Sequence, residues 1–469
     1  MSAYALIIGG ESVSTAQTFD VIDPATGRAF AQAPAATPQH VQGAMERAHA
    51  AFATWKRDEA ARRAAIAAAA DAIQGGVEPL VKLLSQEQGK PLAQAQREVL
   101  GVVGTFRYYA KLAIPVDTTF KDGDSRIEVH RRPFGVVAAV TPWNYPLLIA
   151  SIKIATALLT GNTVVLKPSP YTPLSSLLLG QLANRALPPG VLNVLSGGDE
   201  LGKLVCEHPL VRKISFTGSV ATGKKVAAGA ASDLKRVTLE LGGNDPAIVL
   251  DDVDPKVAAA QLFWGAFTNS GQICTAIKRV YVHESVYEPL VAALSHIAKN
   301  TKVGPGLAPD SQLGPVNNAP QYRRVAELLD DAEQRGARFP AGRGPREGEG
   351  YFFDPVIVTD VTDDARIVAE EQFGPALPVL PFKDVDDALA RANAGHFGLG
   401  ASIWTRDHER GARLAAELDV GTAWVNQHLA LSPLAPFGGS KWSGLGYENG
   451  PWGIDGFTQL QAVNVRAAK

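Results

Sequence analysis

Across the middle of the chain, short runs of β-branched and apolar residues alternate with alanine- and leucine-rich stretches of helical length. The runs are GVVAAV (135–140), NTVVLKP (162–168), GVLNVLSG (190–197), VRKISFTG (211–218) and PAIVLDD (246–252). Strands that alternate with helices in this way form βαβ units, in which a helix crosses over the sheet to join two parallel strands. The pattern therefore predicts an α/β fold built on a parallel sheet.

Composition sets the size of the protein and the partners that we expect. A chain of 469 residues with 46 % hydrophobic and 20 % charged residues has enough apolar material for two or three domains. Its formal net charge of −2 gives no electrostatic basis for binding nucleic acid or an anionic membrane. Two cysteines cannot form a disulfide framework, and the N-terminal segment lacks the features of a secretory signal. We therefore expect a cytoplasmic protein.

Two further stretches bear on the architecture. Residues 136–166 contain Lys153 as their only charge and are long enough to span a bilayer, but prolines, glycines and asparagines interrupt them. We expect strand, loop, buried helix and strand there. Residues 124–135 alternate between polar and apolar side chains like an antiparallel strand. No hairpin partner is apparent beside them, so this strand is expected to pair with a distant segment.

The motif NSGQICTAIK, residues 269–278, places Cys274 directly after a polar, turn-prone stretch. A nucleophilic thiolate needs partial exposure and stabilisation by backbone N–H groups or a helix start. Most free cysteines serve packing instead, and the apolar surroundings of Cys206 favour that role for the second cysteine. Glu207 and His208 lack the spacing of a metal site, so no metal is predicted.

Two other motifs place a polar side chain at a strand or helix end. In TLELGGN (238–244), Glu240 ends a strand before a Gly-Gly turn, where a carboxylate facing a cleft can act as a general base. In TPWNYPL (141–147), two prolines flank Asn144, whose amide could donate to an oxyanion. Taken singly, a solvated strand end and an ordinary helix cap explain these residues better.

Three motifs suggest nucleotide binding. SFTGSVATGKK (215–225) combines a strand, Gly218, Ser219, Gly223 and a helix start, where backbone N–H groups can bind a pyrophosphate. It matches neither the G-x-G-x-x-G fingerprint nor the P-loop, so the signal alone is weak. Lys167 ends the strand in VVLKPSP, where a parallel sheet places ligand-binding groups or merely a solvated lysine. EEQFGP (370–375) adds an acidic pair in a loop.

The motifs gain specificity from their order. Along the chain they read PWN, KPS, FTGS, ELGGN, GQIC, EEQFGP, WVN and PFGGSKWSG. This set resembles the aldehyde dehydrogenase superfamily, and the resemblance covers about residues 15–460. It implies a Rossmann-type dinucleotide-binding domain, an α/β catalytic domain and a small β extension that serves oligomerisation.

The resemblance also implies boundaries and assembly. The dinucleotide-binding domain would combine residues 1–112 and 134–241, and the catalytic domain would span 242–440. Residues 113–133 and 441–469 would form the oligomerisation segment of a homodimer or homotetramer.

By the same resemblance, Cys274 would attack an aldehyde, and Asn144 with the Cys274 backbone N–H would hold the oxyanion. After hydride transfer to the nicotinamide, Glu240 would activate the water that hydrolyses the thioester. Relatives that use coenzyme A usually lack this base, so its presence implies release of a free carboxylic acid.

The cofactor would be NAD or NADP. Residues implied to contact it are Trp143, Lys167, Ser169, Pro170, Gly218, Ser219, Gly223, Leu241, Gly242, Glu371 and Phe373. Many family members have a glutamate where this chain has Pro170, and that carboxylate touches the adenosine ribose hydroxyls. Its replacement removes a repulsion against a 2′-phosphate, so we expect NADP to be tolerated alongside NAD.

The implied substrate pocket is mostly apolar. It comprises Tyr145, Leu148, Ile152, Ile273, Thr275, His428, Leu429, Leu431 and Phe437. Semialdehyde-specific relatives often place an arginine where this chain has Ile152, and an unpaired carboxylate is costly to bury in such a tunnel. We therefore expect an aromatic or medium-chain aliphatic aldehyde.

Other interpretations remain open. The enzyme could oxidise a semialdehyde such as succinic semialdehyde, with Lys153 or Arg279 replacing the usual arginine. A non-catalytic relative with a binding or structural role would be expected to lack Cys274, Glu240 or Asn144, and all three are present. A cysteine hydrolase would need a histidine partner, and none is near Cys274 in the sequence.

Overall fold

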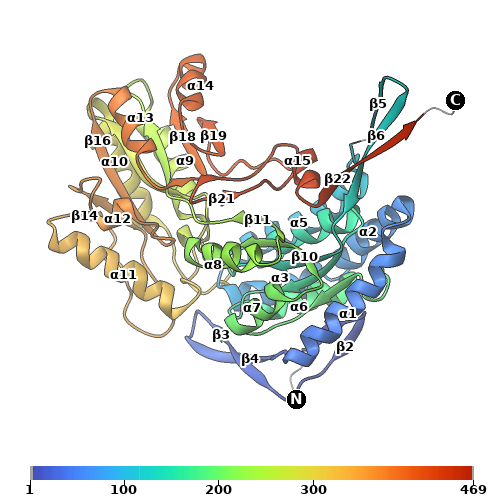
Figure 1. Ribbon diagram of the computed structural model, residues 1–469. Coiled ribbons are helices and arrows are strands. Elements are labelled where there is room, and N and C mark those ends of the chain that lie inside the picture. The colour runs from blue at the N-terminus through green and yellow to red at the C-terminus, as the bar shows by residue number, and fades with distance from the viewer. Residues whose placement is uncertain (1–3, 116, 467–469) are drawn as a thin grey trace.

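The computed structural model describes residues 4–115 and 117–466 (Figure 1). The parts of the predicted domains at residues 1–3, 116 and 467–469 lie outside the described residues. A first sheet has eight strands in the order β2-β1-β9-β8-β7-β10-β11-β21. They are β1 (Leu6–Ile8), β2 (Glu11–Val13), β7 (Val136–Val140), β8 (Thr163–Lys167), β9 (Leu192–Val194), β10 (Val211–Thr217), β11 (Arg236–Glu240) and β21 (Gly444–Leu445).

The central strands of this sheet, from β9 to β11, are parallel. The chain runs outward from β7 through β8 to β9 and then returns to β10 on the other side of β7. Ligands of such open α/β sheets bind at this reversal, outside the carboxyl ends of the strands. The predicted strand, helix and strand over residues 136–166 are confirmed as β7, α5 (Pro146–Leu159) and β8.

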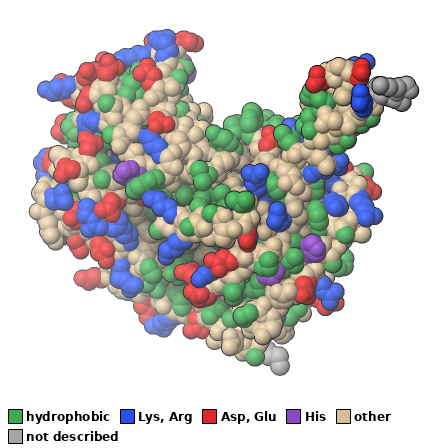
Figure 2. Space-filling view, viewed as in Figure 1, with side chains coloured by type: hydrophobic (Ala, Val, Ile, Leu, Met, Phe, Trp, Pro, Cys, Tyr) green, Lys and Arg blue, Asp and Glu red, His purple; other side chains and the backbone are tan. Residues whose placement is uncertain are grey.

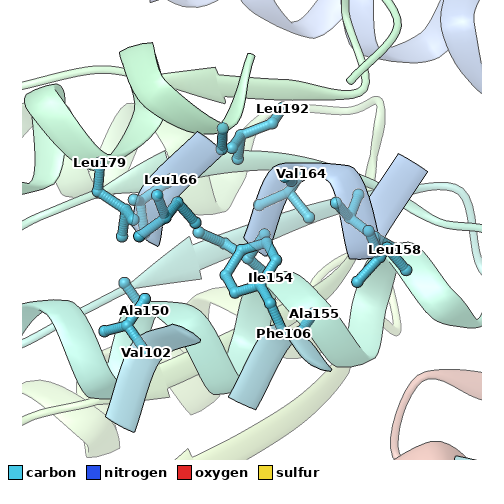
Figure 3. Close-up of a cluster of buried hydrophobic side chains, with 14 of the residues drawn as sticks. Val102, Phe106, Ala150, Ile154, Ala155, Leu158, Val164, Leu166, Leu179 and Leu192 are labelled. Atoms are coloured by element: carbon cyan, nitrogen blue, oxygen red, sulfur yellow. The ribbon is translucent and has the colours of Figure 1, made fainter. Parts of the chain in front are cut away.

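Helices cover both faces of the first sheet. They are α1 (Pro38–Trp55), α2 (Glu59–Gln74), α3 (Val77–Gln88), α4 (Leu92–Lys111), α5, α6 (Pro173–Ala183), α7 (Asp199–Glu207) and α8 (Val220–Ala231). Figure 3 shows part of the core, where Phe106 of α4 and Ile154 of α5 meet Val164 and Leu166 of β8. All four side chains are fully buried. Burying an apolar side chain of this size stabilises the fold by roughly 1.5–3 kcal/mol, which explains the continuous apolar runs in these segments.

A second sheet has seven strands in the order β14-β15-β16-β13-β12-β18-β19, all parallel except the edge strand β14. The strands are β12 (Asp245–Val249), β13 (Ile277–His283), β14 (Arg338–Ala341), β15 (Val356–Thr359), β16 (Ala376–Phe382), β18 (Gly400–Trp404) and β19 (Thr422–Val425). Its helices are α9 (Pro255–Phe267), α10 (Glu284–Asn300), α11 (Ala319–Gln334), α12 (Arg366–Ala369), α13 (Val385–Asn393) and α14 (His408–Ala416).

A three-stranded antiparallel sheet projects from the rest of the molecule (Figure 1). Its middle strand β6 (Ser125–Pro133) pairs with β22 (Thr458–Arg466) on one side and with β5 (Thr118–Asp122) on the other. The predicted pairing of this strand with a distant segment is confirmed by β22. The expectation that no neighbouring segment pairs with this strand is wrong, because β5 forms a hairpin with it. The sequence did not reveal β5 because all of its residues are exposed, so it lacks the alternation of apolar and polar residues that marks a half-buried strand.

The C-terminal segment also ties the two large sheets together. Strand β20 (Ser440–Lys441) pairs with β17 (Phe397–Gly398), and β21 pairs with β11 of the first sheet. After α15 (Gly450–Asp455) the chain enters β22. A separate hairpin of β3 (Thr18–Asp23) and β4 (Arg28–Pro34) lies near the N-terminus. Within the described ranges, no helix has the length and apolar character needed to cross a bilayer.

Candidate active site

The predicted polar residues meet because parallel strands bring their carboxyl ends to one edge. Asn144 follows β7, Lys167 ends β8, Ser219 follows β10 and Glu240 ends β11. The register places Val140 opposite both Lys167 and Phe216, and Thr217 opposite Glu240. The turn with Cys274 comes from the second sheet, between α9 and β13. The site therefore lies between the two sheets.

A strained turn presents Cys274. Asn269, Ser270 and Gly271 have φ values of 55°, 56° and 73°, a left-handed run that non-glycine residues rarely adopt. A Cβ atom on Gly271 would lie 2.3 Å from the carbonyl oxygen of Gly374, so only glycine fits there. Cys274 is half-buried between the buried side chains of Ile273 and Thr275. Burial raises the pKa of Cys274 to about 12, against the lowering effect of the Lys278 ammonium.

The Asn144 side chain is buried and points to the same turn. Its Nδ2 donates one hydrogen bond, of 2.9 Å, to the carbonyl oxygen of Gln272, two residues before the cysteine. The carbonyl oxygen of Asn144 accepts from Lys90 Nζ at 2.8 Å and from Asn269 Nδ2 at 3.2 Å. An amide carries two N–H hydrogens, so the second is available for another acceptor.

Glu240 is a buried carboxylate whose two oxygens have no hydrogen-bond donor within residues 4–115 and 117–466. Burial raises its pKa well above the ordinary value, the nearby Glu448 carboxylate raises it further, and Lys153 lowers it. Lys153 Nζ lies 2.6 Å from Oε1 of Glu448 and 3.1 Å from Ser215 Oγ. A buried, unpaired carboxyl with a raised pKa is suited to general base catalysis.

The two glycines after Glu240 allow other groups to approach closely. A Cβ atom on Gly242 would lie 2.2 Å from Oε2 of Glu371, and one on Gly243 would lie 2.6 Å from the carbonyl oxygen of Cys274. Glu371 Oε1 accepts from the Gly243 N–H at 3.1 Å. The two adjacent glutamates therefore have different surroundings. Glu370 forms ion pairs with Arg324 and Arg366, whereas Glu371 faces the site.

Three of the residues predicted to hold a dinucleotide, Ser219, Gly223 and Leu241, lie at the first turns of α8. Ser219 caps this helix and accepts from the Thr222 N–H. Gly223 permits close packing, because a Cβ atom there would lie 2.4 Å from the Leu241 side chain. Free N–H groups at a helix start favour an anionic ligand, so this arrangement fits a pyrophosphate.

Lys167 and two aromatic rings complete this region. Burial lowers the pKa of Lys167 to about 8, although the Asp199 carboxylate opposes the shift. Trp143 and Phe373, far apart in the sequence, make an edge-on contact with ring centroids 5.3 Å apart. Ser169 is buried and Pro170 is half-buried in the turn after β8.

The predicted pocket residues divide into two groups. Those with partial or full exposure are Tyr145, Leu148, Ile152, Leu429, Leu431 and Phe437. Ile273 is nearly buried and Thr275 is completely so. The His428 ring is also enclosed, with Nδ1 3.0 Å from Ser402 Oγ and Nε2 2.7 Å from the carbonyl oxygen of Thr275. Its polar edge is therefore engaged within the protein, and burial lowers its pKa to about 3.

Lys153 and Arg279, the two cations that could bind the second carboxylate of a semialdehyde, already have partners within the protein. Lys153 pairs with Glu448, and its side chain is fully buried. The Arg279 guanidinium donates to the carbonyl oxygens of Asn244 and Ala392 and to the Tyr281 hydroxyl.

Sequence reasoning missed several buried charges around the site. Lys90 and Glu98 come from segments far from the motifs, and Glu448 follows the PFGGSKWSG motif by four residues. No local pattern distinguishes the three from surface residues, although all are buried. Lys278, by contrast, stands in the cysteine motif itself. Its position in the apolar β13 could have indicated a buried lysine, because such a charge requires partners.

Comparisons with known proteins show the family to which the chain belongs. Residues 12–463 match the family model described as "Aldehyde dehydrogenase family". The chain is 38% identical to human retinal dehydrogenase 2 over 97% of its own length and 90% of that protein's. It is 39% identical to a probable aldehyde dehydrogenase of a Pseudomonas species, covering 99% of this chain and 95% of the relative.

Solved structures resemble the fold equally well. The NAD+ complex of an aldehyde dehydrogenase from Bacillus cereus superposes with a TM-score of 0.96 at 37% identity, over 99% of this chain and 97% of the other. Betaine aldehyde dehydrogenase from Staphylococcus aureus, also with NAD+, gives 0.96 at 32% identity, over 99% and 95%. The predicted fold is thus confirmed, and the protein is an NAD(P)-dependent oxidoreductase that belongs to the aldehyde dehydrogenase family.

Proposed function

We propose that the protein oxidises an aromatic or medium-chain aliphatic aldehyde to the free carboxylic acid, with Cys274 as nucleophile and Glu240 as general base. The observation that carries the proposal is the proximity of three groups. These are a half-buried thiol, an amide bonded to the turn that carries it, and a buried carboxyl that lies close enough to raise the thiol pKa and whose oxygens find no donor among the described residues.

In the first step, the Cys274 thiol loses its proton to solvent, the sulfur forms a bond to the aldehyde carbon, and the carbonyl oxygen takes up the electron pair of the C=O bond. The remaining N–H of the Asn144 amide and the backbone N–H of Cys274 donate to this oxyanion. Donors already fixed in position stabilise the developing charge without reorganising, which is worth several kcal/mol in enzymes that use such a site.

The oxidation needs a hydride acceptor, which a nicotinamide cofactor supplies when it is bound. Ser219 and the start of α8 would hold the pyrophosphate, and Lys167 and Glu371 the riboses. Trp143 and Phe373 would pack beside the cofactor. Ser169, Gly218, Gly223, Leu241 and Gly242 would line the same site. The NAD+ complexes of the similar Bacillus and Staphylococcus enzymes support this assignment.

In the last step, Glu240 removes a proton from water as the water oxygen attacks the thioester carbon. The carbon–sulfur bond breaks, the acid leaves, and the Cys274 sulfur takes up the proton that Glu240 removed from the water. The raised pKa of Glu240 suits this role, because a more basic carboxylate takes up the proton of the attacking water more readily.

The nature of the aldehyde follows from the residues predicted to line its pocket, of which Tyr145, Leu148, Ile152 and Phe437 are half-buried and apolar or aromatic. A second carboxylate would find Lys153 and Arg279 already paired, which disfavours the semialdehyde alternative. Pro170 in place of a carboxylate supports use of NADP as well as NAD.

We also propose that the enzyme is a homodimer or homotetramer, assembled through residues 113–133 and 441–469. Phe120, Leu460 and Val465 expose 47%, 68% and 41% of their surface on the projecting sheet. Figure 2 shows hydrophobic side chains on this projection. Burying them against a second copy would stabilise the assembly. We further propose domain divisions at residues 112, 134 and 241 and a cytoplasmic location.

The test is an assay of nicotinamide reduction with benzaldehyde, hexanal and succinic semialdehyde, each with NAD or NADP and without coenzyme A. We expect turnover of the first two aldehydes and release of the free acid. Cys274→Ala should abolish turnover, whereas Cys206→Ala should retain it, since Cys206 lies on α7 away from the turn. Preference for succinic semialdehyde would contradict the proposed substrate, and a requirement for coenzyme A would contradict the role of Glu240.

A further inference from the structure

Two buried side chains hold the turn that carries Cys274 by donating hydrogen bonds to its backbone carbonyl groups. Lys278 Nζ lies 2.9 Å from the carbonyl oxygen of Ile273 and 2.6 Å from that of Cys274. The next carbonyl, that of Thr275, accepts from His428 Nε2 at 2.7 Å. Three consecutive carbonyls are thus fixed by two enclosed side chains, and a further bond of 3.1 Å joins the Ala276 N–H to the Ile273 oxygen.

The orientation of the peptide group between Ile273 and Cys274 decides where the Cys274 N–H points. The carbonyl of Ile273 and the N–H of Cys274 belong to the same planar trans peptide, so they point in opposite directions. When Lys278 binds that carbonyl, it turns the Cys274 N–H toward the opposite side. That N–H is the backbone donor that the proposed function assigns to the oxyanion.

Lys278 also reaches the carboxylate proposed for the cofactor. Its Nζ is 3.4 Å from Oε1 of Glu371, and only 2% of its side chain is exposed. The same Glu371 oxygen accepts from the Gly243 N–H. A single ammonium therefore connects the nucleophile turn to the loop at residues 370–375.

We propose that Lys278 is a positioning residue for the reaction, which orients the Cys274 peptide and supplies the positive charge beside which the thiolate forms. This inference rests on the proposed role of Cys274 as nucleophile. A lysine suits the task because its ammonium has three hydrogens, enough for the two carbonyls and the Glu371 carboxylate together.

The charges around Cys274 agree with this role. Burial raises the thiol pKa, Lys278 lowers it, and the carboxylates of Asp245, Glu371 and Glu240 raise it. Other charged or titratable groups near the turn are Arg279, Tyr145 and His428. Of the four charged side chains in the described part of the chain that act on the thiol pKa, Lys278 lowers it and the three carboxylates raise it. Removing Lys278 would therefore leave the raising effect of the carboxylates without this opposing charge.

The experiment measures the rate at which iodoacetamide alkylates Cys274 between pH 6 and 11, with the modified peptide quantified by mass spectrometry. We expect Lys278→Met to slow alkylation more than tenfold at pH 8 and at each higher pH in this range, because the variant needs a higher pH to reach the same fraction of thiolate. Lys383→Met removes a lysine whose side chain is 81% exposed beside the second sheet, and it should leave these rates unchanged. Unaltered rates in Lys278→Met across this range would overturn the proposal.

A second variant tests the proposal in the event that Lys278→Met alone does not fold. Asp245→Asn/Lys278→Met removes one buried charge of each sign, and Asp245→Asn alone is its reference. Slower alkylation in the double variant than in Asp245→Asn supports the proposal, and equal rates overturn it. Because the assay contains no aldehyde or nucleotide, its result is independent of the aldehyde assay. Turnover with unaltered alkylation in Lys278→Met would leave the proposed function standing and remove this inference alone.

Discussion

The ammonium nitrogen of Lys90 lies 2.8 Å from the backbone carbonyl oxygen of Asn144 and forms an ion pair with Glu98. Glu98 in turn accepts from the N–H groups of Leu147 and Leu148 at 3.0 and 3.2 Å, in the first turn of α5. Both charged side chains are fully buried. A charge pair therefore fixes the loop that carries the proposed oxyanion donor.

Lys90→Met should both destabilise the protein and reduce its activity. Removing one partner of a fully buried pair typically costs about 3–5 kcal/mol, because the other charge is left uncompensated. Urea unfolding would measure this loss, and kcat would fall because Asn144 is no longer fixed. Lys82→Met breaks an exposed pair with Glu78 and serves as the control. Equal stability of the two variants would contradict the role of the Lys90 pair.

Glu240→Gln should separate oxidation from hydrolysis. Without the base, the thioester should form once and then persist, giving a burst of reduced cofactor of about one equivalent per site. Loss of a general base usually lowers a rate about 10²–10⁴-fold. Mass spectrometry should find the acyl group on Cys274. A variant with neither burst nor adduct would show that Glu240 acts before the thioester forms.

Glu448→Gln should move the pH dependence of thioester hydrolysis. Glu240 works when deprotonated, so the rate rises as the pH passes through its pKa. Glu448 raises the pKa of Glu240, and Lys153 lowers it. Removing the Glu448 charge should therefore lower the Glu240 pKa in two ways, because the repulsion between the carboxylates is lost and Lys153 no longer has its ion-pair partner. The rising limb should therefore shift to lower pH in single-turnover measurements.

The control for this shift is Glu349→Gln, which removes an exposed carboxylate paired with Arg28. Its profile should match that of the parent protein. If the Glu448→Gln profile also stayed in place, Glu448 would have no influence on the ionisation of Glu240.

Gly242→Ala should weaken cofactor binding. The added Cβ atom would lie 2.2 Å from Oε2 of Glu371 and would displace that carboxylate. We expect KM for NAD to rise about tenfold, the effect of losing roughly one hydrogen bond. Gly43→Ala is the matched control, because a Cβ atom in that part of α1 meets nothing within 4 Å. A KM for NAD in Gly242→Ala equal to that of the control would show that Glu371 does not contact the cofactor.

The sequence by itself determined the parallel sheet and the positions of Cys274, Glu240 and Asn144. Apolar periodicity and turn-forming residues are local properties, so they locate strands and the polar residues at their ends. Parallel strands must then share one carboxyl edge, which is why motifs far apart could be expected to meet.

Only the tertiary structure decided which buried charges surround these residues. Lys90 bonds to Asn144 across 54 positions of sequence, and Lys153 reaches Glu448 across 295. Strand β5 escaped recognition because an exposed edge strand need not alternate. The His428 ring, placed in the pocket by resemblance, bonds to Thr275 across 153 positions. Local patterns record how each segment folds, whereas the partner of a buried charge depends on how distant segments are packed together, which no local pattern contains.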